Sequence, residues 1–134
     1  MKPQLLLIED DPELAALYKR SFSFEFEVKT AGTVAEGNKA VLEDQRPAVI
    51  VADRRLPGGD GLSCINLARA VGFTGIVVII TGATMDLEMP HALATHSVQK
   101  IVRKPFHGKQ LDALSQWLRH HVDRGTPLQA FFGT

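Results

Sequence analysis

Three short, fully apolar segments limit most strongly what this chain can fold into. They comprise residues 5–8, 48–52 and 76–80, and each gives way to a polar residue at its carboxyl end. Short aliphatic segments are typical of strands that are covered on both faces of a parallel sheet. Two further segments, residues 26–30 and 98–102, alternate between apolar and polar residues, which favours strands at a sheet edge. The sequence therefore predicts five strands, with the second and the fifth outside.

Helical patterns separate the predicted strands. The first three begin with residues that commonly cap a helix N-terminus, and these caps are Asp11, Thr33 and Asp60. Pro12 supports the first helix, whose predicted inward residues are Leu14, Leu17, Tyr18 and Phe22. Thr33–Glu36 has the pattern of a capping box, and Gly72 is the expected end of the third helix. A fourth helix is expected near residues 86–96, interrupted by Pro90, and a last one over residues 108–122.

This alternation of strands and helices predicts the fold class. Right-handed crossovers between successive strands give an α/β fold with a doubly wound five-stranded parallel sheet and helices on both faces. The inferred central and edge strands suit the order 2-1-3-4-5 of flavodoxin-like folds, in which ligands bind beyond the carboxyl ends of the first and third strands. We expect one domain over residues 1–123 and a C-terminal tail or linker remnant over residues 124–134.

Composition narrows the functional classes. The 134 residues include fifteen basic and fifteen acidic ones, so no net charge attracts the chain to nucleic acid or to an anionic membrane. Apolar residues make up 45% of the chain, but no stretch is long enough to span a membrane, and the apolar segment after Lys2 is too short for a signal peptide. The single cysteine, Cys64, cannot form an internal disulfide and is expected in the core. These features predict a cytoplasmic protein.

Acidic residues follow the first and third predicted strands. Glu9 and Asp10 come directly after residues 5–8, and Asp53 follows residues 48–52. If those strands are parallel neighbours, the carboxylates meet at one sheet edge, where a Mg²⁺ ion would remove their mutual repulsion. The backbone carbonyl of Arg55, just after Asp53, could add a further ligand. Asp11 competes for the metal, but Pro12 makes Asp11 the natural helix cap, so we assign the metal to Asp10 and Asp53, with Glu9 acting through water or orienting the site.

Two other strand ends complete this site. Thr81 ends the fourth predicted strand and offers a hydroxyl donor, while Lys104 ends the fifth and offers a cation suited to phosphate oxygens. Acidic, hydroxyl and ammonium groups around one carboxylate describe a site that transfers a phosphoryl group onto Asp53. The side chains of Arg54 and Arg55 are interpreted as solvated loop charges that could contact a partner.

Over residues 3–123 the chain resembles the receiver domain of two-component response regulators. The matching segments are residues 6–12 (LLIEDDP), 53–61 (DRRLPGGDG), 79–83 (IITGA) and 104–106 (KPF). The resemblance implies Mg²⁺-dependent transfer of phosphate from a histidine of a kinase or phosphotransfer protein to Asp53. It further implies a conformational response through Thr81 and Lys104, with Ala83 in the same phosphate-binding set, and a cis peptide before Pro105.

The chain departs from the family pattern at Ile101. The family usually has an aromatic residue three positions before the lysine, and that residue rotates inward when the threonine engages phosphate. Phosphorylation chemistry is expected to survive this substitution, whereas the aromatic readout is not.

The predicted function is that of a signalling module rather than an enzyme, with self-catalysed phosphoryl transfer and autodephosphorylation as its only reactions. Its expected partners are a histidine kinase or phosphotransfer protein, and a downstream protein or a fused output domain. A phosphorylation-dependent homodimer is one form of response. We expect no direct contact with nucleic acid or membrane. The chain is expected to be a stand-alone receiver or a piece of a larger regulator or hybrid kinase.

Three alternatives were compared with this prediction. A haloacid-dehalogenase-like phosphatase would need an acid at Arg55, and a nucleotide- or flavin-binding fold would need a glycine-rich loop in place of residues 9–11. A pseudo-receiver that only docks partners would lack some of the chemical residues, all of which are present; Ile101 keeps this alternative open.

Overall fold

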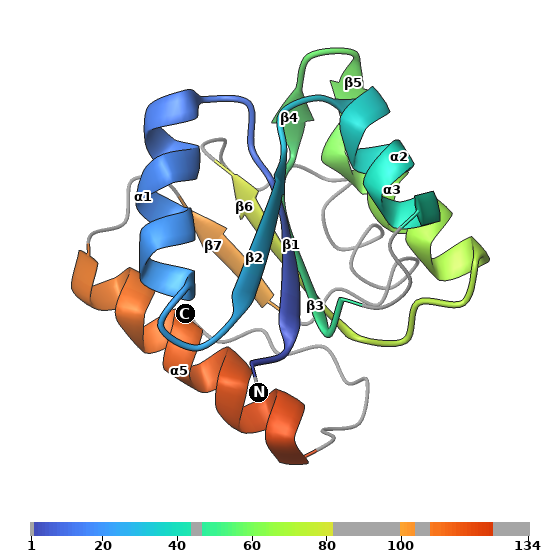
Figure 1. The fold of residues 1–134 in the computed structure, drawn as a ribbon. Coiled ribbons are helices and arrows are strands. Elements are labelled where there is room, and N and C mark those ends of the chain that lie inside the picture. The colour runs from blue at the N-terminus through green and yellow to red at the C-terminus, as the bar shows by residue number, and fades with distance from the viewer. Residues whose placement is uncertain (1, 44–46, 82–99, 104–107, 125–134) are drawn as a thin grey trace.

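The computed structural model describes residues 2–43, 47–81, 100–103 and 108–124 (Figure 1). The first five elements along the chain are β1 (Gln4–Ile8), α1 (Pro12–Phe22), β2 (Glu27–Ala31), α2 (Val34–Glu43) and β3 (Val49–Asp53). They are followed by β4 (Arg55–Leu56), β5 (Gly59–Asp60), α3 (Gly61–Ala70), β6 (Ile76–Thr81), β7 (Lys100–Arg103) and α5 (Gly108–Arg124). The helix predicted near residues 86–96 lies outside the described residues.

The described strands confirm the predicted topology. Five of them form one parallel sheet in the order β2-β1-β3-β6-β7, which is the predicted order 2-1-3-4-5 once the short strands β4 and β5 are set aside. Those two strands form a separate antiparallel hairpin that the sequence pattern did not predict. The central strands β1, β3 and β6 are buried almost throughout, whereas β2 at the edge is mostly exposed.

Helices cover both faces of the sheet. In Figure 1, α1 and α5 lie on one side and α2 and α3 on the other. Successive residues of β1 enter opposite cores: Leu6 and Ile8 pack in the cluster beneath α2 and α3, and Leu5 and Leu7 pack beneath α1 and α5. Because both faces need apolar side chains, the central strands read as uninterrupted apolar segments.

The helix starts follow the predicted caps, with one variation. Asp11 Oδ1 accepts hydrogen bonds from the N–H groups of Glu13 and Leu14, at 2.9 and 3.2 Å. Thr33 Oγ1 accepts from the Glu36 N–H at 3.0 Å. The Glu36 carboxylate accepts from the N–H of Gly32 at 3.2 Å, one residue earlier than a capping box would place it.

Two details of the predicted helices differ in the structure. Leu17 was expected inward, but it is 42% exposed because it lies beside the buried stripe of α1 that Tyr18 and Phe22 form. The last helix continues to Arg124, two residues beyond the expected end. The predicted end of α3 is confirmed, since Gly72 has φ of 101°, a conformation that favours glycine.

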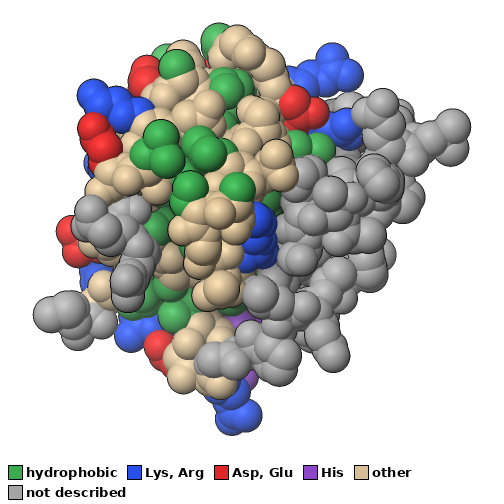
Figure 2. All heavy atoms as spheres, turned by 90° about the vertical axis from the view of Figure 1, so that its right-hand side faces the viewer, with side chains coloured by type: hydrophobic (Ala, Val, Ile, Leu, Met, Phe, Trp, Pro, Cys, Tyr) green, Lys and Arg blue, Asp and Glu red, His purple; other side chains and the backbone are tan. Residues whose placement is uncertain are grey.

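Glycine permits close packing between α2 and α3. A Cβ atom at Gly37 of α2 would lie 2.8 Å from Cys64 Sγ of α3, so any larger residue would push the two helices apart. Cys64 is fully buried there, as predicted. Figure 2 looks onto the side of α2 and α3, where hydrophobic side chains are scattered among polar atoms. None of the helices in the described part of the chain is both long and apolar enough to cross a membrane.

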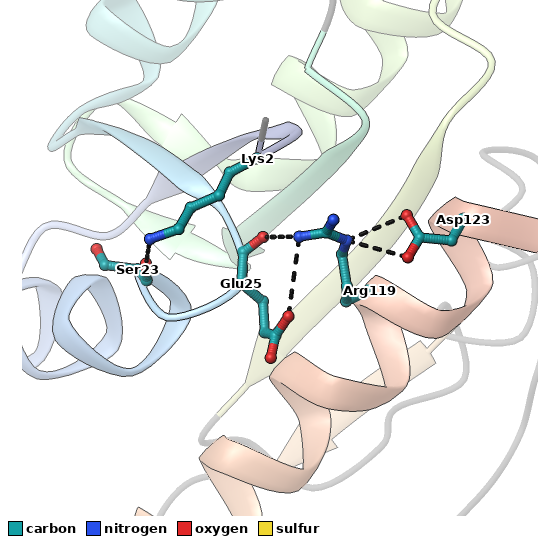
Figure 3. Close-up of polar contacts among 5 residues, drawn as sticks. All are labelled: Lys2, Ser23, Glu25, Arg119 and Asp123. Carbon is teal, nitrogen blue, oxygen red and sulfur yellow. Dashed lines mark hydrogen bonds and ion pairs between the residues drawn. The ribbon is translucent and has the colours of Figure 1, made fainter.

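Arg119 of α5 ties this helix to the turn between α1 and β2 (Figure 3). Its Nη1 donates to the backbone carbonyl of Glu25 at 2.8 Å, and its Nε donates to both carboxylate oxygens of Asp123 at 3.1 Å. Lys2 reaches the same turn, where its Nζ donates to the Ser23 carbonyl at 2.7 Å. The contact between Arg119 and Glu25 fastens α5 to a turn that is 94 residues earlier in the chain.

Candidate functional site

The carboxyl ends of β1 and β3 bring three acidic residues together. Ile8 pairs with Ala52 in the sheet, so the residues that follow, Glu9 just after β1 and Asp53 at the end of β3, lie side by side. One carboxylate oxygen from each of Glu9, Asp10 and Asp53 lies within 4.8 Å of the other two. The predicted acidic cluster is therefore present at the carboxyl-terminal edge of the sheet.

Burial differs among the three carboxylates. Glu9 is 3% exposed and Asp53 is 6% exposed, whereas Asp10 is exposed. Three carboxylates at this spacing repel one another, and a hard divalent cation relieves that repulsion by accepting oxygen ligands. The donor set fits Mg²⁺, which commonly uses one or two carboxylates and keeps several waters. The exposed side of Asp10 leaves room for such waters.

Three hydrogen bonds fix the Asp53 carboxylate and the backbone that follows it. The Arg55 N–H donates to Asp53 Oδ1 at 3.1 Å, which orients the carboxylate and brings the backbone of Arg55 beside it. The Arg54 N–H donates to the Ile80 carbonyl of β6 at 3.0 Å, and the Gly61 N–H of α3 donates to the Arg54 carbonyl at 2.7 Å. The carboxylate of Asp53 is thus carried on a backbone that both β6 and α3 restrain.

Thr81 lies at the same edge of the sheet. Asp53 pairs with Ile80, and Thr81 is the next residue and the last of β6. It is 2% exposed, so its hydroxyl is held in the interior rather than in a solvated loop.

The neighbouring strand, β7, carries one of the other predicted positions, Ile101. Thr81 of β6 pairs with Arg103, the last residue of β7. Ile101, which is also in β7, pairs with Ile79 of β6. Lys104 follows Arg103 directly but lies outside the described residues, as do Ala83 and Pro105. The strand register therefore places Arg103, the last residue of β7, next to Thr81.

The interpretation of Arg54 as a solvated loop charge is wrong. Arg54 is 8% exposed, and its Nε lies 3.3 Å from Asp60 Oδ2. The hairpin of β4 and β5 causes this burial, because it folds Asp60 back toward the end of β3. Arg55, in contrast, is exposed as expected. The available sequence signal was the paired glycines at positions 58 and 59, which indicate a tight turn between Arg54 and an acidic residue.

The fold and this acidic edge together define a receiver-type α/β domain. A family model described as the response regulator receiver domain matches residues 5–116, and the chain belongs to this family. It is therefore a module of two-component signalling, as its sequence predicted.

The relatives and structural neighbours agree with this assignment. The chain is 32% identical over 133 residues to the transcriptional regulatory protein AfsQ1 of Streptomyces coelicolor, covering 98% of this chain and 58% of that protein. It is 25% identical over 115 residues to the sensor histidine kinase TmoS of Ectopseudomonas mendocina, covering 84% of this chain and 12% of that protein. A CheY-like receiver domain protein from Methanospirillum hungatei JF-1 has the same fold, with a TM-score of 0.82 at 20% identity over 93% of this chain and 99% of that one. The chain spans about half the length of the curated regulators that it matches.

Proposed function

We propose that this chain accepts a phosphoryl group on Asp53 from a phosphohistidine of a partner protein, in a Mg²⁺-dependent reaction, and thereby switches its protein contacts. The observation that carries the proposal is the buried carboxylate of Asp53, oriented by the Arg55 N–H and placed within 4.8 Å of two further carboxylates. The receiver domain comprises residues 1–123, and residues 124–134 are a tail or linker remnant.

Glu9, Asp10, Asp53 and the backbone carbonyl of Arg55 would hold the Mg²⁺ ion. When bound, Mg²⁺ offsets the negative charge of the carboxylates and of the phosphoryl oxygens, so that an anionic donor can approach. An Asp53 carboxylate oxygen attacks phosphorus, the new O–P bond forms, and the N–P bond to the donor imidazole breaks. The imidazole nitrogen keeps that electron pair and takes up a proton. Attack by water later returns inorganic phosphate and the free carboxylate.

Thr81 and Lys104 would read the phosphorylated state. The Thr81 hydroxyl donates to a phosphoryl oxygen, and the Lys104 ammonium group neutralises part of the added charge. By the family pattern, Ala83 would belong to the same phosphate-binding set and a cis peptide would precede Pro105. Because Ile101 occupies the usual aromatic position, this position has no aromatic ring that could rotate in response.

The partners follow from the family. A histidine kinase or phosphotransfer protein supplies the phosphoryl group in the cytoplasm, and a downstream protein or a fused output domain receives the signal. TmoS, which matches part of this chain, is described as a sensor histidine kinase, and AfsQ1 as a transcriptional regulatory protein. The chain is thus either a stand-alone receiver or a part of a longer regulator or hybrid kinase. It has no catalytic role beyond its own phosphorylation and dephosphorylation, and it does not bind nucleic acid by itself.

The test is intact-mass analysis after incubation with acetyl phosphate and Mg²⁺. We expect the wild type to gain one phosphoryl group and to lose the gain when the metal is chelated. Asp53→Asn should gain none. Asp112→Asn, which changes an exposed carboxylate of α5, is the matched control and should behave as the wild type. An equal gain in Asp53→Asn would contradict the choice of acceptor, and no gain in the wild type together with no Mg²⁺ binding would favour a docking-only pseudo-receiver.

A further inference from the structure

Arg54 and Asp60 form an ion pair directly beside the proposed acceptor. Arg54 follows Asp53 in the chain, and its side chain is only 10% exposed. Its Nε lies 3.3 Å from Asp60 Oδ2, across the hairpin of β4 and β5. A guanidinium group is costly to bury unless charged or polar partners satisfy it. Arg54 is therefore part of the packed structure at the carboxyl-terminal edge of the sheet rather than a surface charge.

The hairpin between the two residues has little stability of its own. It contains only two residue pairs, Arg55 with Asp60 and Leu56 with Gly59. Gly58 and Gly59 have φ of 91° and 148°. A two-stranded hairpin of this length is marginal in water, so its conformation depends on contacts with the rest of the domain.

Asp60 supplies such contacts with both of its oxygens. Oδ1 accepts the Leu62 N–H at 2.9 Å and thereby caps α3, while Oδ2 faces Arg54. The Arg54 backbone is fixed as well, by the Ile80 carbonyl on one side and the Gly61 N–H on the other. Together these contacts join the end of β3, the end of the hairpin and the start of α3 into one unit.

Arg55, the residue that contacts Asp53 Oδ1, lies within this unit. Its N–H belongs to the peptide that directly follows Arg54, so any tilt of that peptide moves the hydrogen bond at Asp53. The Arg55 carbonyl, which the proposed function assigns to the metal, belongs to the next peptide, between Arg55 and Leu56 of β4, so its direction depends on the conformation of the hairpin.

We infer that the Arg54–Asp60 pair is a positioning device for phosphoryl transfer, which fixes the direction of the Asp53 carboxylate and of the Arg55 peptide. Arg54 acts through Arg55 and does not itself contact the phosphoryl group in this account. The inference rests on the proposed function, in which Asp53 is the acceptor.

The test compares Arg54→Met, Asp60→Asn and the double variant with the wild type. Asparagine is as good a helix cap as aspartate, so Asp60→Asn keeps the cap on α3 while it removes the charge opposite Arg54. The amide nitrogen would then face the Arg54 Nε as a second donor, so the pair is broken. Arg20→Met changes an exposed arginine of α1 and serves as the matched control.

The first readout is the rate of phosphorylation by acetyl phosphate at saturating Mg²⁺. Outer contacts that orient a metal site typically contribute 10- to 100-fold, so each single variant should be slower by about tenfold or more. The double variant should be no slower than the slower single variant, because both changes remove one interaction. Rates within about twofold of the wild type, or losses that multiply in the double variant, overturn the inference.

The second readout does not depend on phosphorylation. Hydrogen exchange of the Arg55 amide, followed by NMR, should accelerate in Arg54→Met relative to sheet amides such as that of Val51. A merely structural role would lower the unfolding temperature without this selective change, and unchanged Arg55 exchange would refute the positioning role. If the wild type neither gains a phosphoryl group nor binds Mg²⁺, the proposed function fails, and the exchange measurement still decides whether the pair positions Arg55.

Discussion

Replacement of Gly61 by alanine tests whether α3 packs directly against the backbone of Asp53, the proposed acceptor. Gly61 is the first residue of α3, and a Cβ atom there would lie 2.0 Å from the Asp53 carbonyl oxygen and 3.1 Å from its carbonyl carbon. Even a close carbon–oxygen contact is about 3.3 Å, so the first turn of α3 or the end of β3 must move by about 1 Å or more.

The expected change in the free energy of unfolding combines two destabilising terms and one stabilising term. Forcing an extra methyl group into a packed site costs about 1–3 kcal/mol. The hydrogen bond from the Gly61 N–H to the Arg54 carbonyl, 2.7 Å long, is stretched in the process, and its loss costs about 1 kcal/mol. Against these, alanine lowers the conformational entropy of the unfolded chain, which stabilises the fold by about 0.4–1 kcal/mol. We therefore expect a net loss of about 1–3 kcal/mol in the free energy of unfolding.

Urea unfolding measures this loss, with Gly108→Ala as the control. Gly108 is also the first residue of a helix, α5, but it is exposed and a Cβ atom there meets nothing within 4 Å. The control should therefore be neutral or slightly stabilised. With an m-value of about 1–3 kcal/mol/M, the two midpoints should differ by about 1 M. Equal midpoints for the two variants would refute the close approach of α3 to Asp53.

Three further predictions concern other parts of the chain. Burial raises the pKa of the Cys64 thiol, so a disulfide reagent at pH 8 should label Cys64 only after unfolding. The free energy of unfolding should also fall above about pH 8.5, because the thiol ionises first in the unfolded chain. Rapid labelling of the native protein would be inconsistent with this prediction. Arg119→Met should lose about 1–2 kcal/mol of the free energy of unfolding in urea, because it removes the hydrogen bond to the Glu25 carbonyl. Asp123→Asn, which removes only the surface ion pair with Arg119, should lose about 0.5 kcal/mol or less. Equal losses would assign the effect to the surface ion pair instead. Asp11→Asn should leave Mg²⁺ affinity, measured by calorimetry, unchanged, since Asp11 caps α1, whereas Asp10→Asn should weaken it; a loss in Asp11→Asn would place Asp11 in the metal site.

The sheet and the acidic cluster could be predicted from local sequence because two simple constraints act there. A strand covered on both faces must be apolar at every position, so β1, β3 and β6 are visible as continuous segments. Parallel pairing then places all their carboxyl ends at one edge, and the positions of Glu9, Asp10 and Asp53 follow without any knowledge of side-chain contacts.

The environment of Arg54 could not be predicted in this way. Its neighbours in sequence are charged residues, glycines and a proline, a composition that reads as a solvated loop. One partner that makes its burial tolerable, Asp60, approaches because the β4–β5 hairpin reverses the chain. The error over Leu17 has a similar origin, since its burial depends on which side of α1 faces the sheet.

The distribution of buried polar residues separates stability from function in this domain. Among the described residues, the buried polar or charged ones are Glu9, Asp53, Arg54, Thr81 and Ser115. All but Ser115 lie at or directly after the carboxyl ends of β1, β3 and β6. Burying charged groups seldom stabilises a fold more than apolar residues of the same size would. This domain concentrates such groups at one edge, while its two cores are almost wholly apolar, so it gives up stability at that edge. For this reason we assign the chemistry to the edge and the positioning role to Arg54.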